Sequence, residues 1–88
     1  LVVELKGLFT VDDKKKMLAV REQHPDVVFA LNFQRSSTRF SRTKTTYAEW
    51  CIKNDFIYGS GELLPDDWFN NTPEQVIKLW LDDKRRWE

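Results

Sequence analysis

The feature that most constrains the fold is a nearly unbroken apolar run of seven residues, Val27-Val28-Phe29-Ala30-Leu31-Asn32-Phe33. Such a run is typical of an interior strand covered on both faces, because a strand with one wet face alternates apolar and polar residues. Residues 1–8 form a second strand pattern, and residues 10–24 between them have helical features. Strand, crossover helix and strand make a βαβ unit, so we predict two parallel strands in one α/β sheet.

Capping signals and breakers predict the ends of the remaining elements. The first helix begins after Thr10, with acids in its first turn, and ends near His24, where Pro25 blocks continuation. His24 is the only histidine; a general base is conceivable, but its place favours a helix-terminating or core-edge role. The next expected elements are a short helix opened by Thr46, a short edge strand at 56–58 and a turn at 59–61. Leu63, Leu64 and Trp68 are expected to dock on the core. A final helix should run from Pro73 to the chain end and include Trp87 and a basic end at 84–86.

Glu4 and Lys6 interrupt the first strand at alternate positions. Strand side chains alternate faces, so both should project from one face, and Gly7 lets the chain turn off the strand end. A carboxylate can hold a divalent cation, and a neighbouring lysine can order a water or stabilise a phosphate oxyanion, as in a metal nuclease. The alternative is a salt-bridged pair on an exposed strand.

Composition bounds the class of protein. With 88 residues, 41% hydrophobic, the chain is expected to form a single globular domain over residues 1–88. One cysteine and one histidine exclude an internal disulfide and a structural zinc site, and we expect Cys51 to be buried and inert. There is no apolar run long enough to span a bilayer, so a soluble, cytoplasmic protein is expected.

The 14 basic and 14 acidic residues balance overall but not locally. Residues 34–44, called the basic loop below, follow the second strand and contain Arg35, Arg39, Arg42 and Lys44 with no acid. The carboxyl ends of parallel strands share one edge, so we expect this loop near Glu4 and Lys6. The candidate phosphate contacts are Arg35, Ser36, Ser37, Arg39, Arg42 and Lys44, with Lys14 and Lys15 on the first helix. The alternative is a solvated surface loop.

An ordered series of motifs over roughly residues 2–68 resembles the phage endonuclease I family of Holliday-junction-resolving nucleases, within the PD-(D/E)xK superfamily. The motifs in this series are V-E-L-K-G-L at 3–8, D-D-K-K at 12–15, V-R-E-Q-H-P at 20–25, S-S-T-R at 36–39, Y-A-E-W-C at 47–51 and L-P-D-D-W at 64–68. The run R-E-Q-H-P is the most specific. The fold this implies is a restriction-endonuclease-like core fragment, a small mixed sheet with flanking helices.

The resemblance implies that Glu4 is a metal ligand for Mg²⁺ or Mn²⁺ and that Lys6 is the catalytic lysine. The family's remaining acids have no counterpart in the chain: an aspartate about ten residues before Glu4 would fall upstream of Leu1, as would a glutamate on an early helix. We therefore expect the carboxy-terminal portion of a phage nuclease, in the host cytoplasm. Family members are intertwined homodimers, which leaves dimerisation of this chain open.

The expected activity of the parent protein is hydrolysis of phosphodiester bonds in branched DNA such as four-way junctions. A non-catalytic DNA-binding or interaction module with the same fold is the alternative, since one carboxylate alone fixes a dication poorly. A sequence-specific or mismatch-directed nuclease is a third possibility.

Overall fold

The computed structural model describes residues 1–81, and the expected places of Trp87 and the basic end at 84–86 lie outside this range. The elements in chain order are β1 (Val2–Lys6), α1 (Val11–Gln23), β2 (Phe29–Phe33), α2 (Tyr47–Lys53), β3 (Ile57–Ser60), α3 (Asp67–Asn70) and α4 (Pro73–Leu81). None of the helices in residues 1–81 is long and apolar enough to cross a membrane.

The three strands form one sheet in the order β1-β2-β3, and both pairings are parallel. The predicted βαβ unit is therefore confirmed, and β2-α2-β3 makes a second one. A mixed sheet was expected, whereas every strand pairing within residues 1–81 is parallel. Glu4 lies opposite Leu31 and Lys6 opposite Phe33, so the two charged residues of β1 are next to the largely buried strand β2.

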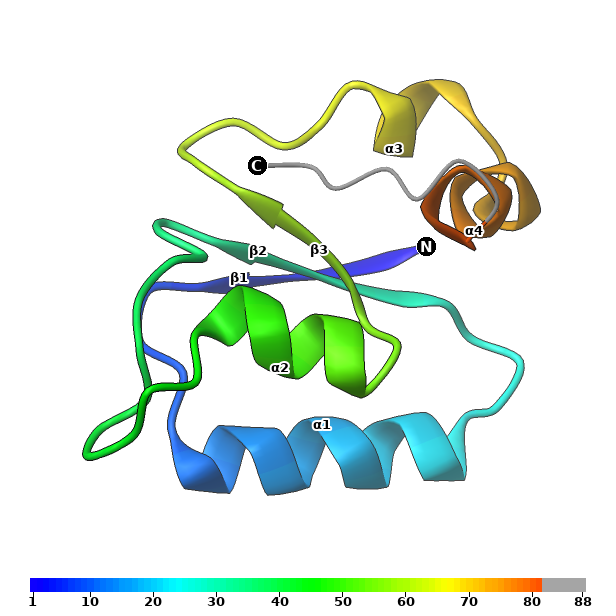
Figure 1. Cartoon of the computed structure of the whole chain (residues 1–88). Coiled ribbons are helices and arrows are strands. Elements are labelled where there is room, and N and C mark those ends of the chain that lie inside the picture. Colours follow the sequence, from blue (N-terminus) through cyan, green and yellow to red (C-terminus); the bar gives the residue numbers. More distant parts are fainter. Residues whose placement is uncertain (82–88) are drawn as a thin grey trace.

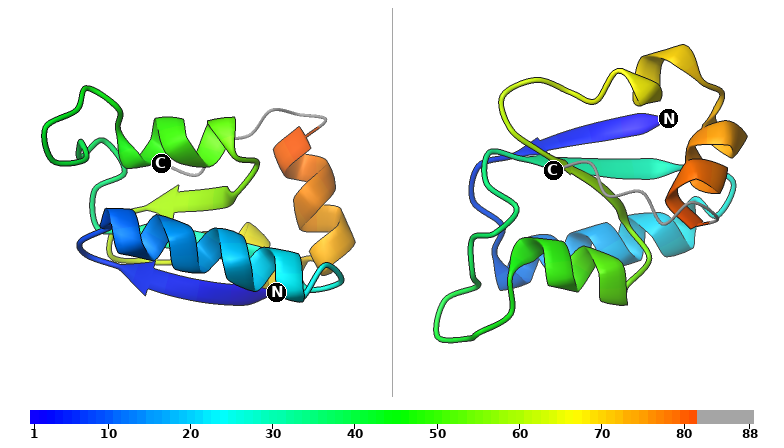
Figure 2. Two further views of the ribbon diagram at one scale, coloured as in Figure 1. Left: turned by 90° about the horizontal axis from the view of Figure 1, so that it is seen from below. Right: turned by 45° about the horizontal axis from the view of Figure 1, so that its top comes forward.

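The helices divide between the two sides of the sheet (Figure 1). Both α1 and α2 lie below the sheet in that view, whereas α3 and α4 lie above it. The further views in Figure 2 place α4 at one end of the molecule, and Ile77 and Trp80 of α4 line a pocket with Phe29 and Ile57, near the amino ends of β2 and β3. The opposite edge, where the strands end, is free of α4.

Side-chain caps begin the helices where the sequence predicts them. The hydroxyl of Thr10 accepts a hydrogen bond from the backbone N–H of Asp13, and the Asp13 carboxylate accepts one from the backbone N–H of Thr10. Thr46 caps α2 by accepting from the N–H of Glu49. Thr72 and Gln75 make a reciprocal capping pair before α4. His24 is the exposed C-cap of α1, which confirms its helix-terminating role.

The structure also differs from expectation at three places along the chain. β2 begins at Phe29 rather than Val27, because the turn after Pro25 is closed by the backbone N–H of Val27 donating to His24. β3 extends through the expected turn to Ser60. Leu63 is 85% exposed instead of docking on the core, whereas Trp68 is buried as predicted.

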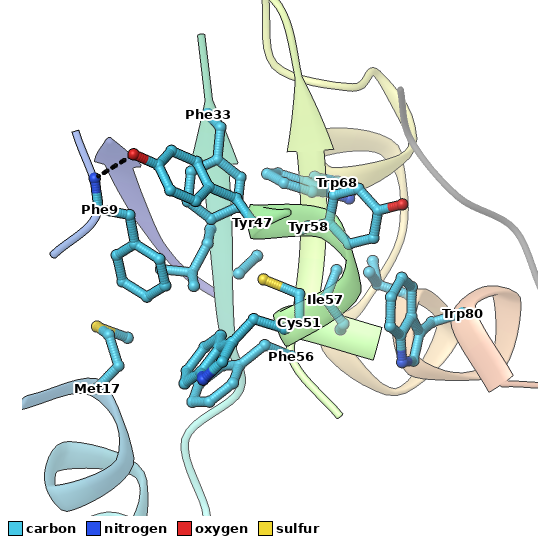
Figure 3. Close-up of a cluster of buried hydrophobic side chains, with 14 of the residues drawn as sticks. Phe9, Met17, Phe33, Tyr47, Cys51, Phe56, Ile57, Tyr58, Trp68 and Trp80 are labelled. Atoms are coloured by element: carbon cyan, nitrogen blue, oxygen red, sulfur yellow. Dashed lines mark hydrogen bonds between the residues drawn. The ribbon is translucent and has the colours of Figure 1, made fainter. Parts of the chain in front are cut away.

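Phe9 lies at the centre of an aromatic cluster in the core (Figure 3). Its ring centroid is 5.1 Å from that of Trp50, 5.4 Å from Phe33 and 5.6 Å from Phe40. The backbone N–H of Phe9 donates a 3.1 Å hydrogen bond to the Tyr47 hydroxyl. These contacts join the connection between β1 and α1 to β2, the basic loop and α2.

Cys51 is fully buried on α2, and this burial raises the pKa of its thiol well above the usual range. A thiol held in its protonated form is a poor nucleophile, because the thiolate is the reactive species. The expectation of a buried cysteine is confirmed, and its environment agrees with an inert role.

Gly59 tests how tightly β3 is packed. A Cβ atom at this position would lie 2.6 Å from Asn32 Oδ1, 3.1 Å from Pro65 and 3.2 Å from Trp68. We expect Gly59→Ala to lower the free energy of unfolding by about 1–3 kcal/mol, as overpacking does in cores. Gly7→Ala is the control, because its Cβ would come no closer than 3.8 Å to any side chain, and it should change stability by less than about 0.5 kcal/mol. Urea unfolding of the two variants measures the difference; equal stabilities would contradict the close approach.

Candidate active site

Glu4 and Lys6 lie on one face of β1, with Glu4 in the middle of the strand and Lys6 at its carboxyl end. β1 stays in unbroken register with β2 from Val2 to Lys6, so side chains two residues apart share a face. Glu4 is exposed, and the side chain of Lys6 is 20% exposed. The Lys6 ammonium lies 3.6 Å from Asp13 Oδ1, which places this face toward α1. Neither group is sealed in the apolar core.

Asp13 also belongs to this site, although its sequence pattern indicates only an acid in the first turn of a helix. Its Oδ2 atom accepts hydrogen bonds of 3.0 Å from both the backbone N–H and the hydroxyl of Thr10. The pKa of the Asp13 carboxyl lies below its usual value, chiefly because of the bond from the Thr10 backbone, with smaller contributions from the Thr10 hydroxyl and Lys6. The spacing T-x-x-D at residues 10–13, two residues after E-x-K-G at residues 4–7, was the signal that could have found it.

A pocket of about 390 Å³ opens beside Lys6 on the sheet edge. It is lined by Leu5, Lys6, Gly7, Asn32, Gln34, Gly61 and Glu62. The backbone N–H of Gln34 donates to the carbonyl of Lys6 at 3.2 Å, and Asn32 Nδ2 donates to the carbonyl of Gly61 at 3.0 Å. These bonds hold the ends of the three strands together around the pocket. No sequence pattern indicated a role in the site for Asn32, Gln34 or Glu62.

The donor set for a metal ion is incomplete within the described part of the chain. Glu4 offers one exposed carboxylate, which suits a hard cation such as Mg²⁺ that takes oxygen ligands and keeps several waters. Residues 1–81 contain no group of three or more histidine, cysteine, aspartate or glutamate side chains placed to hold a metal. Glu4 thus fits the role of one ligand among several.

The basic loop begins at the same edge and is anchored by its backbone. The N–H of Ser36 donates to Ser60 Oγ at 2.9 Å, and the carbonyl of Ser36 accepts from the N–H of Ala48 at 2.9 Å. Ser36 is only 5% exposed, so its observed contacts are with β3 and α2. The other candidate loop contacts, Arg35, Ser37, Arg39, Arg42 and Lys44, are exposed.

The outer part of the basic loop folds back beside the start of α1. Arg39 and Thr46 form an antiparallel bridge, and Phe40 between them is buried in the aromatic cluster. The Lys14 ammonium lies 3.8 Å from the centroid of the Phe40 ring, which ties α1 to this loop, whereas Lys15 is exposed. A groove of about 430 Å³ lies between residues 8–11 and residues 38–41.

Comparison with known proteins shows the family of the chain. A model of the phage endonuclease I family matches residues 1–87. The chain belongs to this family. The family match reaches past residue 68, further along the chain than the motifs that carried the resemblance.

Two phage members of the endonuclease I family are similar to the chain. Endonuclease I of Escherichia phage T7 is 36% identical over 75 residues, covering 84% of the chain and 50% of that relative. Endodeoxyribonuclease 1 of Enterobacteria phage T3 is 39% identical over 64 residues, covering 72% of the chain and 41% of the relative. The chain thus spans about half the length of these relatives.

The lowered pKa of Asp13 predicts a pH-dependent contribution to stability. Because the folded-state pKa is depressed, the contribution is fully present above the unfolded value of about 3.9 and is lost as pH falls through the folded value. We expect Asp13→Asn to be less stable than the wild type at neutral pH. The difference in free energy of unfolding should shrink as the pH falls from about 3.9 through the lower, folded-state pKa of Asp13. Urea unfolding over this pH series measures the gap. Asp12→Asn, a change in the same helical turn, should show a smaller and flatter difference; a gap for Asp13→Asn that persists at the lowest pH would contradict the assignment.

Proposed function

We propose that the chain forms part of a metal-dependent DNA endonuclease that hydrolyses phosphodiester bonds in branched DNA such as four-way junctions. The observation that carries the proposal is the placement of Glu4 and Lys6 on one face of β1, with the basic loop starting next to Lys6, where the N–H of Gln34 donates to the Lys6 carbonyl. The relatives from phages T7 and T3 are named as endonucleases, which supports the same chemistry for the complete gene product.

In this proposal Glu4 supplies one carboxylate oxygen to Mg²⁺ or Mn²⁺, and the remaining ligands come from outside the described residues. A bound dication would supply Lewis-acid stabilisation of the scissile phosphate and a more acidic water. Lys6 orients the attacking water or stabilises the negative charge that develops on the phosphate. The half-buried position of Lys6 favours this electrostatic role, because less water competes for its ammonium than at a fully exposed lysine.

The basic loop is proposed to hold the DNA backbone. Arg39, Arg42 and Lys44 are exposed, and Arg39 lines the groove shared with Thr10 and Val11 at the start of α1. Lys15 adds an exposed cation on α1. Cations that neutralise phosphates release counterions, so the affinity should depend strongly on salt. Arg35 and Ser37 extend the same surface toward the strand ends. Ser36 contributes through its buried backbone contacts, which fix where the loop leaves the sheet.

The complete protein is further proposed to act as a homodimer. Resolving a four-way junction requires two cuts at symmetry-related positions, and two copies of one site can place both. Exposed apolar side chains around the strand end, including Leu5, Leu8 and Leu63, supply surface suited to contact with further protein.

The catalytic assignment predicts a loss of cleavage without a loss of binding. In the complete gene product, Glu4→Gln and Lys6→Gln should each lower the rate of cleavage of a four-way junction in Mg²⁺ by about 100-fold or more, since each removes a group that acts on the transition state. Junction affinity measured in Ca²⁺, which suppresses cleavage, should change little. Lys16→Gln, at an exposed lysine of α1, is the matched control and should keep the wild-type rate.

The outcomes separate the two candidate functions. Wild-type rates in Glu4→Gln and Lys6→Gln would remove these residues from the site. Tight junction binding by the wild type with no cleavage in any divalent metal would favour a non-catalytic DNA-binding module of the same fold.

The DNA interface predicts a change in salt dependence. Replacing Arg39 and Arg42 together by alanine should lower the slope of log affinity against log salt by about two, at roughly 0.9 per phosphate contact on B-DNA. The double variant Lys53→Ala, Lys78→Ala removes two exposed charges from other helices and serves as the control. Titrations of a four-way junction and a linear duplex in Ca²⁺ measure both slopes. Equal slopes in the two double variants would leave the basic loop as a solvated surface loop.

A further inference from the structure

We propose that Asp13 is a positioning residue of the candidate active site, which holds the ammonium group of Lys6 at the carboxyl end of β1. The inference rests on the proposed function, because Asp13 acts only through Lys6. It assigns a second role to a residue whose sequence pattern indicates a helix cap alone.

The two oxygens of the Asp13 carboxylate have separate partners. Oδ2 is held by Thr10, whose backbone N–H and hydroxyl both donate to it at 3.0 Å. Oδ1 takes no part in the cap and lies 3.6 Å from the ammonium of Lys6. The cap therefore fixes the plane of the carboxylate, and with it the direction of the oxygen that faces Lys6.

Thr10, the residue that holds this carboxylate, is next in sequence to a residue of the core. Thr10 follows Phe9, whose ring is buried in the aromatic cluster and whose N–H is bonded to the Tyr47 hydroxyl. The Thr10 hydroxyl also accepts from the N–H of Asp13 at 3.2 Å, so the first turn of α1 cannot rotate without breaking several bonds at once. Lys6 is thus held against a fixed charge, although it lies on an edge strand of the described sheet.

Lysine needs such a partner more than most side chains do. Its four-carbon stem rotates freely, so an unpaired lysine samples many positions for its ammonium group. Partly exposed ion pairs contribute little to folding stability. The consequence of this pair is therefore geometric: it restricts the ammonium to the space beside Asp13, on the face of β1 that also carries Glu4.

The first test compares two neighbouring aspartates of α1 in the complete gene product. Asp13→Asn removes the charge that faces Lys6, whereas Asp12→Asn removes a charge from the same turn with no lysine contact among the interactions described. We expect Asp13→Asn to lower the single-turnover cleavage rate of a four-way junction in Mg²⁺ by about 10- to 100-fold, as small misplacements of a catalytic group do. Its junction affinity in Ca²⁺ should stay within about twofold of the wild type, and Asp12→Asn should keep both values.

The second test reads the position of Lys6 without any cleavage. In a ¹H–¹⁵N spectrum of the lysine ammonium groups, the Lys6 signal, assigned from its absence in Lys6→Gln, should be visible in the wild type and in Asp12→Asn because a paired ammonium exchanges slowly. It should broaden or disappear in Asp13→Asn, while circular dichroism shows that the variant remains folded. A purely structural cap would not produce this selective change.

The outcomes distinguish this inference from the proposed function. If Lys6→Gln keeps the wild-type cleavage rate, the proposed function fails, and the ammonium spectrum still decides whether Asp13 holds Lys6. If Lys6→Gln is inactive while Asp13→Asn matches Asp12→Asn in rate and in spectrum, the positioning role is overturned. A parallel loss of rate and affinity in Asp13→Asn would also overturn it, because that pattern indicates a damaged fold.

Discussion

The burial of the Phe9 ring is the interaction on which the site depends. Phe9 contacts aromatic side chains from β2, the basic loop and α2, and its backbone is bonded to Tyr47. Each aromatic pair contributes about 0.5–1.5 kcal/mol beyond the burial of its area. Because Phe9 lies between Lys6 and the cap of α1, this cluster fixes both the end of β1 and the start of the helix that faces it.

Much of the fold follows from local signals in the sequence. The apolar run that ends at Phe33 predicted an interior strand, and the threonines at the helix starts predicted three of the four helices in residues 1–81. The end of β3 could not be predicted, because Gly59 looks like a turn residue until its neighbours are known. Only the close approach of Asn32 and Trp68 shows that a glycine is required within the strand. The prediction that Leu63 docks on the core was wrong, because hydrophobicity alone does not determine burial.

The site was partly predictable. The alternation of strand side chains places Glu4 and Lys6 on one face, and parallel pairing brings the basic loop to the same edge. The burial of Ser36 and the contact between Lys6 and Asp13 could not be predicted, because both depend on how segments distant from one another pack. A capping pattern specifies a hydrogen bond to the backbone and leaves the second carboxylate oxygen unspecified. That oxygen is the one that reaches Lys6.

β1 is an edge strand of the described sheet, so its outer backbone groups can template the addition of another strand. Its exposed apolar residues, Val2 and Leu5, increase that tendency toward aggregation, and Glu4 and Lys6 are the charges on the strand that oppose it. The same two side chains are therefore gatekeepers of solubility as well as candidates for chemistry. Apolar replacements at these positions could lower the measured activity by causing aggregation as well as by removing a catalytic group. Polar replacements keep the strand soluble, so a lower activity then reports on the chemistry alone.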